Sequence, residues 1–114
     1  MGMPTIQEIL TGNLAEIIEQ HADGSSSGAT ATEAGVTGKK HFITSVEAWS
    51  DGAVLLQLKD DTTIIEQIKA LANTSFEMKF FPPVAISADK KAEAKIANST
   101  SNCHITLYGF TVDE

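Results

Sequence analysis

Few residues in this chain could bind a metal or act as a nucleophile. The sequence contains three histidines, His21, His41 and His104, and a single cysteine, Cys103. No histidine has a second ligand three or four residues away, and a structural zinc site needs three or four cysteine or histidine ligands. We therefore expect no metal and no other cofactor. Cys103 is interpreted as a small buried hydrophobic residue at the start of a strand.

The sequence gives little support for covalent or acid–base catalysis. A cysteine nucleophile needs a base within hydrogen-bonding distance, and His41 could supply one only through the fold. Carboxylates are plentiful, but most are expected at turns or on polar strand faces, where solvation explains them. A domain this small leaves little room for a catalytic pocket. We expect that the protein is not an enzyme.

Aromatic residues offer one other kind of site. Trp49 and Tyr108 could form a platform on which sugar rings stack, with Trp49 as the surface contact. In the alternative interpretation, Trp49 ends a strand and its ring packs against the edge of the domain. The sequence alone leaves both interpretations open.

The elements that would position these side chains are mostly strands, within a β domain over residues 39–114. Apolar and polar residues alternate through 54–58, 76–80 and 92–96, whereas 41–49 and 104–112 are apolar on both faces. Turn signals separate these runs, including Ser50-Asp51-Gly52, Asn73-Thr74, Pro82-Pro83 and Ala88-Asp89. Several short strands at this spacing predict a β-sandwich or barrel.

Residues 62–72 fit two descriptions. Ile64, Ile65, Ile68 and Leu71 are spaced like the stripe of a helix. The neighbouring strands favour a strand over Thr62–Ala70, interrupted by a bulge. We predict the bulged strand and keep the helix as the alternative.

The N-terminal residues 1–22 are predicted to form an amphipathic arm, helical or extended. Thr5 and Glu8 have the spacing of a capping box, and six apolar residues recur at offsets of three and four. A helix this short needs a surface to pack on. That surface is either the face of its own domain or a neighbouring subunit. The predicted partner-binding residues of the arm are Ile6, Ile9, Leu10, Leu14, Ile17 and Ile18.

Residues 23–38 are predicted to be a flexible linker. The stretch is almost entirely small and polar, so it buries too little apolar surface to order by itself. It could also become ordered against a partner. Its glycines form no phosphate-binding pattern.

Charge and composition narrow the range of partners. The chain has 114 residues and a net charge of −7, which argues against binding to nucleic acid phosphates. It contains no apolar run of membrane-spanning length and no visible signal peptide, so we expect no membrane partner. We expect the protein to be made in a cytoplasm.

Four runs of the β domain resemble a known kind of protein. They are HFITSVEAWS at 41–50, Leu58-Lys59-Asp60, SFEMKFFP at 75–82 and ITLYGF at 105–110. Over residues 39–112 the chain resembles the small jelly-roll decoration proteins, also called cement or stapling proteins, of short-tailed phage capsids. The resemblance implies a mainly β, jelly-roll sandwich that forms a homodimer or homotrimer.

The resemblance also implies a function. Such a protein is a virion structural protein, assembled in the host cytoplasm, that decorates the capsid exterior and stabilises the shell by bridging neighbouring subunits of the major capsid protein. Proteins of this kind act by binding, so the resemblance implies no catalytic residues. The alternative is a trimeric head-fibre or tail domain that contacts host glycans through Trp49. A bacterial cytoplasmic interaction module is a third interpretation.

Overall fold

The computed structural model of this chain describes residues 15–25, 28–97 and 102–113, and these residues form an all-β structure. Four of the predicted arm residues, Ile6, Ile9, Leu10 and Leu14, lie outside the described residues. In the described part of the chain, no helix is long and apolar enough to cross a membrane. The strands are β1 (Ala15–Gly24), β2 (Ala29–Glu33), β3 (Lys39–Ser50), β4 (Val54–Asp60), β5 (Thr63–Ala70), β6 (Thr74–Ala85), β7 (Ala92–Ala97) and β8 (Cys103–Asp113).

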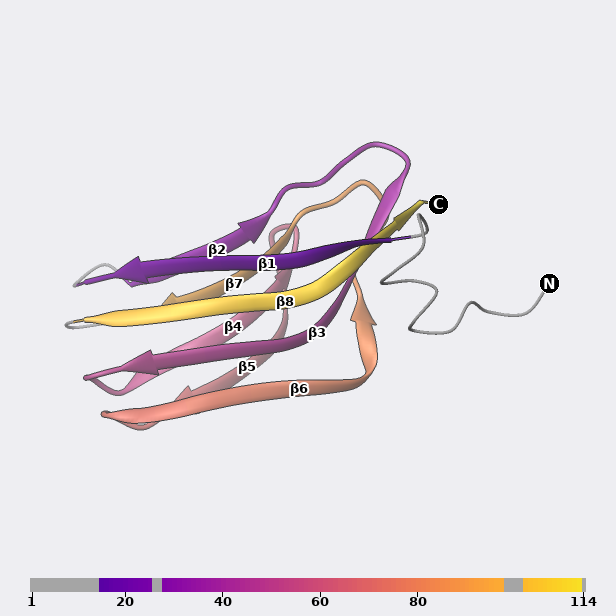
Figure 1. Ribbon diagram of the computed structural model, residues 1–114. Coiled ribbons are helices and arrows are strands. Elements are labelled where there is room, and N and C mark those ends of the chain that lie inside the picture. The colour runs from indigo at the N-terminus through magenta and orange to yellow at the C-terminus, as the bar shows by residue number, and fades with distance from the viewer. Residues whose placement is uncertain (1–14, 26–27, 98–101, 114) are drawn as a thin grey trace.

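The strands form two four-stranded antiparallel sheets that face each other (Figure 1). The first has the order β1-β8-β3-β6 and the second the order β2-β7-β4-β5. The first strand pairs with the last along its whole length, from Ala15 opposite Val112 to Gly24 opposite Cys103. Two sheets of four strands joined in this order are an eight-stranded jelly roll. The predicted jelly-roll β-sandwich is confirmed.

The core lies between the two inner faces, and its pattern follows the alternation seen in the sequence. In β4 the side chains of Val54, Leu56 and Leu58 are buried, and in β7 Ala94 and Ile96 are fully buried. Small residues in β7 let the opposing sheet approach closely. The largest fully buried apolar side chains are Ile18, Ile43, Leu56, Leu58, Ile86, Ile96, Ile105, Leu107 and Val46.

Three tight turns contain an Asp or Asn residue in the left-handed backbone conformation. Asp61, Asn73 and Asp89 have φ angles of 57°, 57° and 65°, and Asp and Asn tolerate this region because their short side chains bond locally. The turn predicted at Pro82-Pro83 is wrong, because both prolines lie within β6. They occupy a gap in the pairing with β3, and β6 is an edge strand, where a missing N–H donor is tolerated.

Of the two forms predicted for the arm over residues 1–22, helical or extended, residues 15–22 adopt the extended one, but as part of the domain. Residues 15–24 form strand β1, which pairs with β8. Ile17 and Ile18 are adjacent, so in a strand they point to opposite faces. Ile17 is 66% exposed and Ile18 only 1%. Hydrogen bonding to the last strand of the chain therefore overrides the local helical spacing.

The flexible linker predicted over residues 23–38 is also wrong where strands form within it. Residues 29–33 form β2, which pairs with β7 and buries Ala29 and Ala31 in the core. A bridge between Ser25 and Gly28 turns the chain from one sheet to the other. The sandwich thus includes residues that the sequence had assigned to an arm and a linker.

The bulged strand predicted over residues 62–70 is confirmed as β5. Leu58 lies opposite Glu66 and Lys59 opposite Ile64, so Ile65 is the extra residue of a bulge. The bulge shifts the alternation by one residue, so that Ile65 and Ile68 both pack against the core. Their spacing of three, which resembled a helix, is produced by this bulge.

Candidate interaction surface

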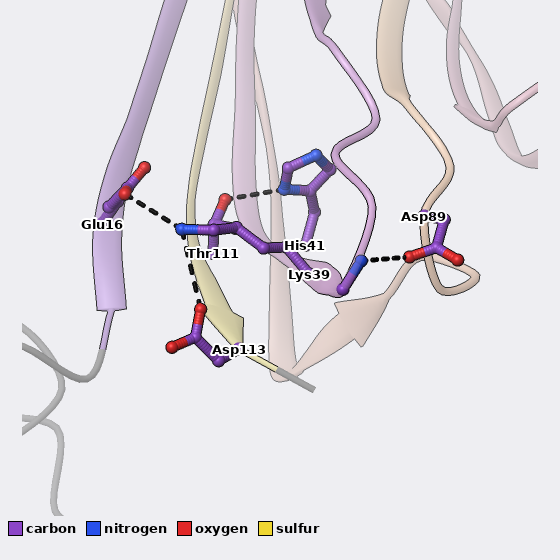
Figure 2. Close-up of polar contacts among 7 residues, drawn as sticks. Glu16, Lys39, His41, Asp89, Thr111 and Asp113 are labelled. Carbon is purple, nitrogen blue, oxygen red and sulfur yellow. Dashed lines mark hydrogen bonds and ion pairs between the residues drawn. The ribbon is translucent and has the colours of Figure 1, made fainter.

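The start of β1 is held in place by polar contacts at one end of the sandwich (Figure 2). The Lys39 ammonium lies 3.2 Å from a Glu16 carboxylate oxygen and 3.6 Å from one of Asp113. Hydrogen bonding and charge from Glu16, followed by Asp113, raise the pKa of Lys39 above its ordinary value of 10.5. Nearby, the Gly38 N–H donates to Asp89 at 2.7 Å. These contacts tie together β1, β3 and β8 beside the point where residues 1–14 join the domain.

Behind this ion pair, His41 is buried and fully hydrogen-bonded. It is 2% exposed, with Nδ1 2.6 Å from the Thr111 hydroxyl oxygen and Nε2 2.8 Å from the carbonyl oxygen of Ala34. One ring nitrogen thus contacts β8 and the other the segment between β2 and β3. Both nitrogens are engaged within the fold, which makes His41 a structural residue and leaves it no free nitrogen for a base.

The outer face of the sheet β1-β8-β3-β6 carries an apolar row at the same end. Ile17, Phe110 and Phe42 lie opposite one another on three adjacent strands. The two phenyl rings stack with centroids 5.3 Å apart, and the Lys40 ammonium lies 5.8 Å from the Phe42 ring centre. An outer sheet face is usually polar. An apolar row there marks a surface that can be covered by a partner.

At the other end of this face the structure places Trp49 beside His104. Their ring centroids are 5.8 Å apart and the planes nearly parallel, and His21 lies 5.9 Å beyond His104. His21 contacts the Thr106 hydroxyl at 2.7 Å and Asp23 at 2.9 Å. Trp49 is half-buried next to the end of β3, with part of its surface accessible. The Trp49 ring thus packs on a neighbour and stays partly open. Tyr108 lies opposite Ser45, four residue pairs away along β3 and β8, so the two aromatic residues predicted as one platform are separated.

A shallow cleft of about 330 Å³ lies next to this aromatic group. Glu47 and Glu77 face each other across β3 and β6 and line it together with Ser75 and His104. The Tyr108 hydroxyl donates to Glu47 at 3.2 Å. Burial, followed by the charge and hydrogen bond of Glu47, raises the pKa of Tyr108 above its ordinary value of 10.0. Carboxylate acceptors beside aromatic rings suit a ligand with hydroxyl groups.

Residues that could have formed a catalytic pair are kept apart. Cys103 is a free thiol, 4% exposed, at the first position of β8, as predicted. His41 lies at the opposite end of the sheet, because Cys103 pairs with Ser50 and His41 with Thr111. Within residues 15–25, 28–97 and 102–113, no group of three or more His, Cys, Asp or Glu could hold a metal ion.

The side of the sandwich formed by β5 and β6 was not singled out from the sequence. Across the sandwich, β1 and β2 lie in close contact, whereas β5 and β6 approach each other much less. In Figure 1, β1 and β2 lie along the upper margin and β6 along the lower one. Apart from Met78, the large apolar side chains that β5 and β6 direct inward are only partly buried, namely Ile65, Ile68, Phe76, Phe80 and Val84. We call this strip the β5–β6 seam.

Comparison with known proteins gives similarity of fold only. No protein-family model and no curated protein matches the sequence. Among solved structures, the chain is similar to the coat protein of tobacco streak virus, with a TM-score of 0.53 and 9% identity over 93% of this chain and 90% of that one.

Two further structures are similar at lower scores. One is a virus-like particle of the extra small virus of the prawn Macrobrachium rosenbergii, with a TM-score of 0.41 and 15% identity over 98% and 88% of the two chains. The other is a CBM36-1 domain of a xylanase from the hindgut metagenome of Trinervitermes trinervoides, with a TM-score of 0.39 and 8% identity over 88% and 97%. At 9% identity, the likeness to the coat protein shows that this chain has a jelly-roll fold of the kind seen in that protein.

Proposed function

We propose that this chain is a virion structural protein that decorates the exterior of a tailed-phage capsid and stabilises the shell by bridging neighbouring major capsid protein subunits. The observation that carries the proposal is the complete eight-stranded jelly roll, similar over nearly its whole length to a viral coat protein. The quoted runs at 41–50, 75–82 and 105–110, which resemble decoration proteins, form β3, β6 and β8 of this fold. A protein of this kind works by binding, without catalysis and without a cofactor.

The proposed bridging uses two contacts held at a fixed spacing. One is the rigid sandwich, and the other is the segment 1–14 with its apolar residues Ile6, Ile9, Leu10 and Leu14. The Lys39 ion pairs fix the point at which this segment joins the domain. Two weak contacts joined in this way act at high effective concentration, so together they hold far longer than either alone. Ile18 contributes to the core instead, because it is 1% exposed.

Cosedimentation with phage heads tests the proposal. The heads would come from the phage that carries this gene, grown with the gene deleted. The full-length chain should cosediment with the heads and raise the temperature at which they release DNA. A chain with Ile6, Ile9, Leu10 and Leu14 changed to Ser should bind much more weakly while keeping the thermal stability of the sandwich. The matched control is Val36→Ser, an equally polar change at an exposed position outside segment 1–14.

Two outcomes would contradict the proposal at different points. If the full-length chain does not bind the heads, the decoration function is wrong. If the four-serine chain binds as tightly as the original, bridging by segment 1–14 is wrong and the sandwich alone makes the contact.

The second candidate is a trimeric head-fibre or tail domain that binds host glycans. The observation that favours it is the partly open Trp49 ring beside His104 and next to the cleft lined by Glu47 and Glu77. Binding to a glycan array that is selective and is lost in Trp49→Ala would support this function. Failure to bind any glycan, together with binding to heads, would leave decoration as the function.

A further inference from the structure

Exposed apolar side chains are concentrated on and beside the two strands that flank the seam. Among the described residues, five large apolar side chains are exposed, and three of them, Ile64, Leu71 and Phe81, lie on or directly beside β5 and β6. Phe81 is 99% exposed and Leu71 is 74% exposed. A phenyl ring left wholly in water contributes nothing to the stability of the single chain. Such a side chain on a protein surface is typical of an interface anchor.

The β5–β6 seam lies directly beside this exposed phenylalanine. Phe80 precedes Phe81 in the chain and lines the seam, together with Phe76 of the same strand and with Ile65 and Ile68 of β5. These four side chains are packed against the core on one side and remain partly accessible on the other. The strands that flank the seam therefore carry both a fully exposed aromatic group and a strip of partly open apolar side chains that a partner could cover.

The edge strands β5 and β6 both have features that prevent another strand from extending the sheets. β6 contains Pro82 and Pro83 and a gap in its pairing with β3, and β5 contains the bulge at Ile65. Prolines and bulges block the regular ladder of hydrogen bonds that strand addition requires. A partner on this side must therefore bind through side chains.

The charges on this side allow a second copy of the chain to approach. β5 carries Glu66 and Lys69, and β6 carries Glu77 and Lys79, so each strand is neutral in a protein of net charge −7. The edge on the opposite side differs, since β1 carries three acidic residues and no lysine or arginine. Two copies that meet through β5 and β6 avoid the repulsion that two β1 edges would meet.

We propose that the β5–β6 seam is the interface of a two-fold homodimer, in which Phe81 of each copy inserts beside Phe76, Phe80, Ile65 and Ile68 of the other. A two-fold axis pairs each surface with itself, so the exposed Phe81 and the seam of one chain are each used twice. The inference deepens the proposed bridging, since a dimer presents two shell-binding surfaces. The dimer is tested with the purified chain alone. A chain that does not dimerise is therefore a different result from a chain that does not bind capsids.

The molar mass of the purified full-length chain in solution tests the interface, measured by sedimentation equilibrium over a concentration series. The expected species has the mass of two 12.1-kDa chains. Phe81→Asp should weaken the dimer at least about 30-fold, the effect of losing an interface anchor. Val36→Asp is the matched control, because it adds the same charge at an exposed apolar position outside β5 and β6. It should leave the dimer unchanged.

Leu71→Asp, at the other end of the seam, is a second test and should also weaken the dimer. Circular dichroism checks that each variant is folded, which is expected because all three side chains are exposed. The proposal is overturned if the original chain is monomeric throughout the series or has the mass of three chains. It is equally overturned if both seam variants dimerise normally, or if Val36→Asp dissociates the dimer as strongly as they do.

Discussion

Two neighbouring isoleucines test whether β1 belongs to the folded core. Ile18 is 1% exposed and Ile17 is 66% exposed, although both lie in the same strand. Replacing isoleucine with alanine removes three carbon groups, worth about 2.4 kcal/mol if fully buried at about 0.8 kcal/mol each. The cavity left in the core adds to this loss, so Ile18→Ala should lower the free energy of unfolding by about 2–5 kcal/mol.

Ile17→Ala is the matched control, because it loses the same groups and the same strand preference. Only about a third of its side chain is buried, so its expected loss is about 0.8 kcal/mol. Urea unfolding at one fixed protein concentration measures both changes, with the fluorescence of Trp49, the single tryptophan, as the signal. If the two variants lose equal stability, or if neither loses more than about 1 kcal/mol, the assignment of Ile18 to the core is refuted.

Three further predictions follow from the polar contacts. The single tyrosine, Tyr108, should ionise above pH 10.0 in an ultraviolet absorbance titration, and Glu47→Gln should bring its pKa closer to that value. A raised pKa at Lys39 means that its ion pairs stabilise the fold fully below pH 10.5 and are lost as the pH rises through the raised value. The stability difference between the original chain and Lys39→Gln should thus be constant from neutral pH upward and shrink above pH 10.5, as thermal melts would show. His41→Leu leaves the buried Thr111 hydroxyl and the Ala34 carbonyl without their hydrogen bonds to the ring, and should lower the free energy of unfolding by roughly 1–3 kcal/mol in urea.

The parts of the fold that the sequence predicted are those with strong local alternation. Strands β4, β6 and β7 direct every second side chain into the core, and this pattern is visible without knowing their partners. The bulge in β5 was predictable because a strand had to fit between its neighbours despite the helical spacing of Ile65 and Ile68. The jelly-roll arrangement came from resemblance, since alternation alone does not specify strand order.

The N-terminal strands were missed for a different physical reason. In β1 the inward positions after Ile18 are Gln20 and Ala22, so the apolar alternation is weak. In β2 the buried side chains are the small Ala29 and Ala31, and alanine has little intrinsic preference for strands. Both strands are stabilised by partners far away in the sequence, which local spacing cannot reveal.

The candidate interaction surface was predicted only in part. Trp49 was identified as a residue able to contact a ligand, and it lies half-open beside His104. The seam was not predicted, although Phe76 and Phe80 were assigned to one face of a strand. Whether such a face is covered depends on how far the two sheets diverge along β5 and β6, which is a property of the whole sandwich.

The pairing of the first strand with the last also governs how the protein folds during synthesis. β1 leaves the ribosome before any other strand of the sandwich, yet its hydrogen-bonding partner β8 is made last. The sheet β1-β8-β3-β6 has a gap between β1 and β3 until β8 arrives. Contacts this distant in sequence make folding slow. Until β8 is made, β1 therefore lacks the strand that holds it in this sheet. The last strand of the sandwich is thus the closing step in its folding.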